Sequence, residues 1–90
     1  MAAHASITAK KIVTVTVDPG SILDGNVEEI AVTVPGAVSG DFVATQKETE
    51  DSIYIIAAWV SDTDEVTLVF FNPSSGTVNA DSQSVSVMLF

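Results

Sequence analysis

The chain has 90 residues, of which 47% are hydrophobic and 17% are charged, and its formal net charge is −9. This length fits one domain with a single modest core. Three lysines without any arginine argue against a nucleic-acid partner, and the absence of cysteine excludes a disulfide framework or a thiolate metal site.

No run of about 18 apolar residues occurs, so we expect no membrane span. The first ten residues lack the apolar segment of a signal peptide and show no strand pattern. We therefore divide the chain into a flexible N-terminal arm, residues 1–10, and a folded domain, residues 11–90.

Apolar and polar residues alternate with a period of two along most of the domain, which is typical of β-strands. In residues 11–17, for example, valines alternate with threonines, and Asp18-Pro19-Gly20 then supplies turn residues. Short strands separated by Gly/Pro clusters indicate an all-β sandwich or barrel. The predicted strands are residues 11–17, 27–34, 42–46, 53–60, 64–71 and 83–90.

The hairpin 53–71 is the most informative segment. A four-residue loop at 61–64 would place Trp59 opposite Val66 on an apolar face that forms the core. The opposite face is apolar as well, which a two-layer domain leaves uncovered. This second face carries Tyr54, Ile56, Val69 and Phe71.

Two interpretations of this second face remain open. A loop, residues 18–26 or 72–82, folds over it, or another subunit covers it, because large apolar patches on a protein surface mark interfaces. In the second case Tyr54, Ile56, Val69 and Phe71 form an oligomer interface, and closed symmetry is the default.

A search for chemistry yields no catalytic residue. His4 is the only histidine and lies in the arm, so a Ser-His-Asp triad is not expected. The acidic clusters 62–65 and 48–51 are interpreted as solvated turns, although oxygen ligands of this kind also suit calcium. We expect no metal site and no cofactor. Trp59 is interpreted as a core residue rather than a sugar-stacking platform, and Gly40 as a turn residue with positive φ.

Several segments in the second half carry a resemblance to a known family. They are Gly40-Asp41-Phe42-Val43, Ala57-Ala58-Trp59-Val60, Asp64-Glu65-Val66-Thr67-Leu68, Asn72-Pro73-Ser74-Ser75-Gly76 and the final strand Val85 to Phe90. In this order they resemble the small β-domain of capsid decoration (cement) proteins and head-fibre proteins of tailed bacteriophages. The likeness covers roughly residues 12–90. Where that family often has an arginine, near position 69, this chain has Val69-Phe70-Phe71.

The resemblance implies a small jelly-roll-like antiparallel β-sandwich without enzymatic activity. It also implies a homotrimer that binds the major capsid protein on the outside of an icosahedral head and stabilises the virion. The arm is then the candidate capsid contact, through His4, Ile7, Lys10 and Lys11. The alternative is a glycan-binding knob or a head- or tail-fibre module.

Overall fold

The structure is a computed structural model that describes residues 8–48 and 51–90. These residues form eight strands and no helix, so the predicted all-β class is confirmed. No helix that could span a membrane is found in the described part of the chain. The strands are β1 (Lys11–Val17), β2 (Gly20–Ile22), β3 (Val27–Thr33), β4 (Val43–Lys47), β5 (Tyr54–Asp62), β6 (Glu65–Phe71), β7 (Val78–Ala80) and β8 (Gln83–Leu89).

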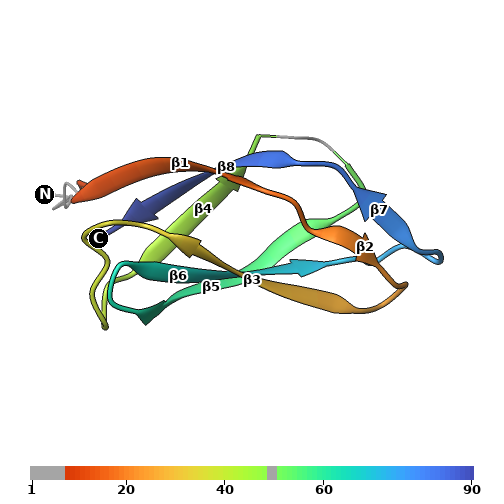
Figure 1. Ribbon diagram of the computed structural model, residues 1–90, viewed down its shortest axis with the longest axis horizontal. Coiled ribbons are helices and arrows are strands. Elements are labelled where there is room, and N and C mark those ends of the chain that lie inside the picture. Colours follow the sequence, from red (N-terminus) through yellow and green to blue (C-terminus); the bar gives the residue numbers. More distant parts are fainter. Residues whose placement is uncertain (1–7, 49–50) are drawn as a thin grey trace, which may run out of the picture.

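Two antiparallel three-stranded sheets form the layers of a sandwich (Figure 1). Their strand orders are β1-β8-β4 and β3-β6-β5, and a separate pair, β2-β7, lies at one end. Strands from the two halves of the chain pair in nested order, β1 with β8, β2 with β7 and β3 with β6, as in a jelly roll. The fourth pair of a jelly roll is missing, because β4 pairs with β8 and not with β5. β1 begins and β8 ends at the end of the sandwich opposite the β2-β7 pair.

The core lies between the two sheets. It forms because alternate side chains of each strand point inward. From β8 these are Val85, Val87 and Leu89, and from β6 they are Val66, Leu68 and Phe70. All six are fully buried.

The β5-β6 hairpin has its predicted register at Tyr54–Phe71 and Ile55–Phe70 but departs from it nearer the turn. The turn has two residues, Thr63 and Asp64, and the pairing shifts once between Val60 and Asp62 and again between Ile55 and Ala57. Each β-bulge moves the following side chains to the other face. Val60 therefore pairs with Val66, whereas Trp59 pairs with Thr67 on the outer face. The expectation that Trp59 pairs with Val66 in the core is wrong, because the bulges were not visible in the alternation.

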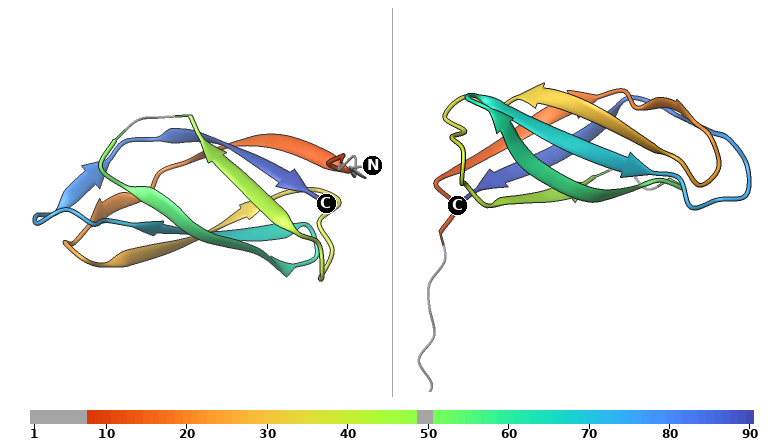
Figure 2. Two further views of the ribbon diagram at one scale, coloured as in Figure 1. Left: turned by 180° about the vertical axis from the view of Figure 1, so that it is seen from behind. Right: turned by 90° about the horizontal axis from the view of Figure 1, so that it is seen from below.

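The two loops considered as covers for the second face do not cover it. Segments 18–26 and 72–82 contain the short strands β2 and β7, which the sequence analysis missed, and these pair with each other. Ile22 and Ala80 belong to the core cluster. Figure 2 (right) shows the β3-β6-β5 sheet with no other strand lying over its outer face.

Asn72, the first residue after β6, joins two connections of the fold, β2–β3 and β6–β7. Its side-chain Nδ2 donates to the carbonyl oxygens of Ile22, at 2.8 Å, and Gly76, at 2.9 Å. Its Oδ1 accepts from the backbone N–H of Ser74 at 2.9 Å. Its backbone also pairs with Gly25 and Asn26. The side chain is fully buried, so these bonds satisfy groups that water does not reach.

Replacing Asn72 with alanine should destabilise the domain by about 2–4 kcal/mol, because buried carbonyl groups lose their donors. The control is Ser75→Ala, which alters an exposed residue of the same turn and should change stability by less than about 0.5 kcal/mol. Urea denaturation of both variants measures the difference. Equal stabilities would show that Asn72 does not hold the turn.

Candidate functional site

The outer face of the β3-β6-β5 sheet carries large apolar side chains on all three strands. Strand register places Val27, Phe71 and Tyr54 in one row across the sheet. We call the whole set the hydrophobic face; it consists of Val27, Tyr54, Ile56, Trp59, Val69 and Phe71.

The residues of the hydrophobic face differ in how much of each side chain is exposed to solvent. Tyr54 is 58% exposed, Ile56 56% and Trp59 42%. Ile56 is exposed because it is the extra residue of the bulge between Ile55 and Ala57. Val69, by contrast, is only 7% exposed, since it lies on the central strand between Glu29 and Ala57. Of the four predicted interface residues, Tyr54 and Ile56 are therefore open to a partner, Phe71 is half-buried and Val69 is buried within its own chain.

Glu29 is an exposed acidic residue on this same face, directly beside Val69. A contact between two identical faces would bring two such carboxylates into one interface, which costs free energy. An isologous contact through this face is therefore disfavoured.

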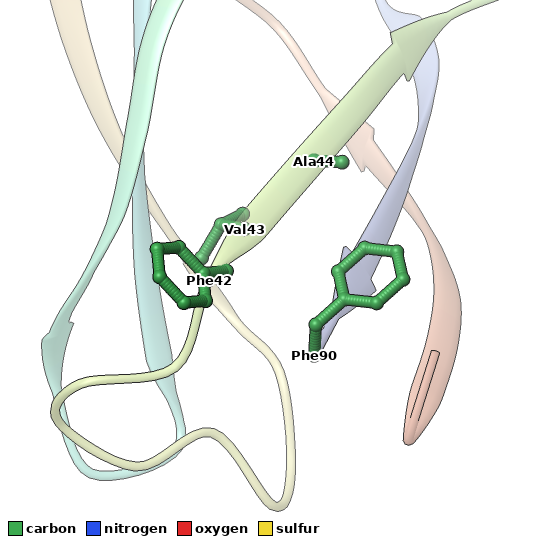
Figure 3. A pocket seen from close by; sticks show the side chains of 4 residues that line it. All are labelled: Phe42, Val43, Ala44 and Phe90. Atoms are coloured by element: carbon green, nitrogen blue, oxygen red, sulfur yellow. The ribbon is translucent and has the colours of Figure 1, made fainter. Parts of the chain in front are cut away.

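A second apolar area lies on the other sheet, where β1, β8 and β4 present Ile12, Met88 and Ala44 in one row. Phe42 and Phe90 lie at its end and exchange backbone hydrogen bonds at 3.3 and 2.9 Å. We call these five residues the Phe42 patch. Phe42 is 79% exposed and Ile12 65%. Figure 3 shows the two phenylalanine rings beside a hollow of about 350 Å³ that Val43 and Ala44 also line.

Lys10 and Asp41 form an ion pair of 2.8 Å beside the Phe42 patch. The Asp41 carboxylate also accepts the Val38 backbone N–H at 3.0 Å. The Lys10 ammonium and then this backbone bond hold the pKa of Asp41 below its usual value of 3.8. The pair therefore links Lys10 to the loop that precedes β4.

The acidic clusters predicted as solvated turns bind donors of their own chain. At the β5-β6 turn, Asp64 accepts the Gly36 N–H at 2.7 Å and Glu65 accepts the Ser61 hydroxyl at 2.7 Å. Asp51 accepts from Lys47 and Gln83. Within residues 8–48 and 51–90, no three acidic or histidine side chains gather as a metal site would require.

Of the four predicted capsid-contact residues, the structure describes only Lys10 and Lys11. His4 and Ile7 lie outside the described residues. Lys10 donates its backbone N–H to Leu89 at 2.7 Å, and Lys11 is the first residue of β1. Two of the three lysines are thus already paired with acids, Lys10 with Asp41 and Lys47 with Asp51. Little positive charge is left for an acidic partner.

Sequence reasoning missed Val27, Trp59 and the Phe42 patch as surface features. Val27 and Ile12 were detectable, because each occupies the outward position of an alternating strand where its neighbours are polar or charged. The positive φ of Gly40, 94°, was predicted correctly. The exposure of Trp59 depends on the two β-bulges in β5, which the alternation of apolar and polar residues does not reveal.

Comparison with protein-family models, with curated proteins and with solved structures gives no match to this chain.

The Lys10–Asp41 pair should give a defined pH dependence. Because the pKa of Asp41 is lowered in the folded state, the pair stabilises the fold above pH 3.8, and this contribution is lost as the pH falls through the lowered value. Wild type should therefore exceed Asp41→Asn in stability near neutral pH, and the two should converge in strong acid. Urea denaturation across this pH range, with the exposed Asp81→Asn as control, tests it; a constant difference would contradict it.

Proposed function

We propose that this chain is a structural protein of a bacteriophage virion that decorates the outside of an icosahedral head as a homotrimer. One observation supports this most strongly. Tyr54, Ile56 and Trp59 are exposed on a sheet face that is largely apolar apart from Glu29, and no other strand of residues 8–48 and 51–90 lies over that face. An apolar patch of this kind is typical of a subunit interface.

The sequence resemblance supplies the class of partner. The segments that resemble decoration proteins include the turn that Asn72 stabilises and residues Val85 to Phe90, most of which belong to β8. The proposed mechanism is mechanical and needs no catalytic group. Three linked copies contact several capsid subunits at once, so individually weak contacts add up to firm attachment. We propose that residues 1–10 contact the major capsid protein. The net charge of −9 keeps the free protein soluble.

A matched pair of isoleucine variants tests the interface. Ile56→Asp places a charge on the hydrophobic face and should convert the trimer to a folded monomer. Ile12→Asp places the same charge on the other sheet and should leave the trimer intact. Both residues are more than half exposed, so each variant should retain the monomer's stability to within about 1 kcal/mol.

Sedimentation velocity measures the oligomeric state, and circular dichroism confirms folding. The interface proposal is wrong if Ile56→Asp and Ile12→Asp have the same mass.

The attachment to capsids has its own test. Purified protein should cosediment with phage heads that lack it and saturate at a multiple of three copies. Removal of residues 1–7 should weaken this binding about tenfold or more, because each arm contributes to a multivalent attachment. Failure of the intact protein to bind such heads would contradict the decoration role, whatever its oligomeric state.

The second candidate function is a glycan-binding knob, and the exposure of Trp59 favours it specifically. Trp59 and Tyr54 lie on the same outer face and offer aromatic surfaces on which a sugar ring can stack. Addition of oligosaccharides should then quench or shift Trp59 fluorescence, and Trp59→Ala should abolish binding. An emission spectrum that does not respond to any sugar in a broad panel would exclude this candidate.

A further inference from the structure

β1 is an edge strand of the β1-β8-β4 sheet. It pairs with β8 along one side, in seven consecutive positions without a bulge, and within residues 8–48 and 51–90 no strand pairs with its other side. Its residues Ile12 to Val17 are all β-branched, a type that fits extended strands. The backbone N–H and C=O groups on the open side are therefore a regular template on which a further strand can pair.

The other three edge strands carry features that hinder pairing. β3 has two adjacent carboxylates, Glu28 and Glu29, and β5 has two bulges. β4 is only five residues long and lies against β5 where the two sheets meet. From Ile12 to Val17, by contrast, β1 has no charge, no proline and no irregular pairing. Since natural sheets block their edges by such features, β1 is the edge most open to another strand.

Charge favours a second copy of the chain as the partner of β1. Residues 8–17 contain two of the three lysines, Lys10 and Lys11, and none of the twelve acidic residues. The first acidic residue, Asp18, directly follows β1. When two copies of β1 run antiparallel, the lysine end of each lies beside Asp18 of the other. Opposite charges therefore meet at both ends of the pair, although each copy has a net charge of −9.

The side-chain pattern of β1 also matches its own reverse. When Thr14 of one copy lies opposite Thr14 of the other, Val13 lies opposite Val15. Ile12 then lies opposite Thr16. Because side chains directly opposite each other share a face, the valines of both copies stay on the core side and the other three residues stay exposed. This register keeps the inward and outward directions of both strands.

We propose that two copies pair through β1, antiparallel and centred on Thr14, so that their three-stranded sheets join as β4-β8-β1-β1-β8-β4. A two-fold axis at Thr14 relates the copies, so the contact is isologous and closed. The strand pair covers about 240 Å² of each copy, well below the roughly 1,200 Å² of total area that stable interfaces bury. Free copies therefore pair weakly, and copies held side by side pair more firmly. The inference does not depend on the decoration role; on a head, this contact would join neighbouring trimers.

Single cysteines report which positions of two copies meet, because the chain has none of its own. The test variant is Thr14→Cys, and the matched control is Thr16→Cys, an exposed threonine on the same face of the same strand. In the proposed pair the two Thr14 positions lie opposite each other within disulfide range, whereas the two Thr16 positions are about 14 Å apart along the strands. Under mild oxidation at equal concentration, Thr14→Cys should form the covalent dimer, about 19 kDa, tenfold or more faster.

A mixture of two variants tests the register. Ile12→Cys and Thr16→Cys, combined in equal amounts, should form a mixed disulfide about tenfold or more faster than either variant forms a disulfide with itself. The reason is that these two positions lie opposite each other in the proposed pair, whereas each lies far from its own counterpart. Mass spectrometry identifies the mixed dimer.

Each outcome decides the proposal. Equal rates for Thr14→Cys and Thr16→Cys would overturn it, because they would indicate random collision, and so would a mixed disulfide that forms no faster. The same measurements in the Ile56→Asp background separate this contact from the proposed trimer, since the preference for Thr14→Cys should remain there. Its loss would place Thr14 within the trimer interface and contradict the two-fold pairing. Circular dichroism confirms that each variant is folded, and the substituted positions are all exposed.

Discussion

The strand β6 lies at the centre of its sheet and is buried on both faces. Val66, Leu68 and Phe70 point into the core, and Thr67 and Val69 are covered on the outer side by the flanking strands β3 and β5. The outward side chains of the flanking strands β3 and β5 are more exposed, because a two-layer sandwich has no third layer to cover them. Tyr54, Ile56 and Trp59 are left in water as a result. In the proposed trimer, the burial of these side chains drives association.

Local features determine which side chains occupy that face. Two bulges in β5 turn Trp59 outward and place Ile56 on the surface, while Asp64, with a φ of 61°, closes the tight turn that precedes β6. At the other end of β6, Asn72 satisfies the carbonyl groups of Ile22 and Gly76 and thereby ties β6 to β2 and to the turn before β7. The composition of the hydrophobic face thus follows from backbone geometry at both ends of one hairpin.

The strands with strong alternation were predictable from sequence, since their inward valines and leucines differ so clearly from their outward threonines and serines. β1 and β8 are examples. β2 and β7 were not, because three residues are too few to show a period. A second apolar face was inferred correctly from Tyr54 and Ile56, but the inclusion of Val69 as a contact residue overlooked the shielding that a central strand receives from both neighbours. Trp59 could not be placed, because a single added residue reverses the direction of a side chain.

The most direct test of the account is the solution mass of the intact protein, measured by light scattering during size-exclusion chromatography. The proposed homotrimer predicts a mass of three chains of 9.4 kDa, which is about 28 kDa. A homogeneous species of 9.4 kDa at all accessible concentrations would contradict the account, because it would show that Tyr54, Ile56 and Trp59 remain in water without a second copy.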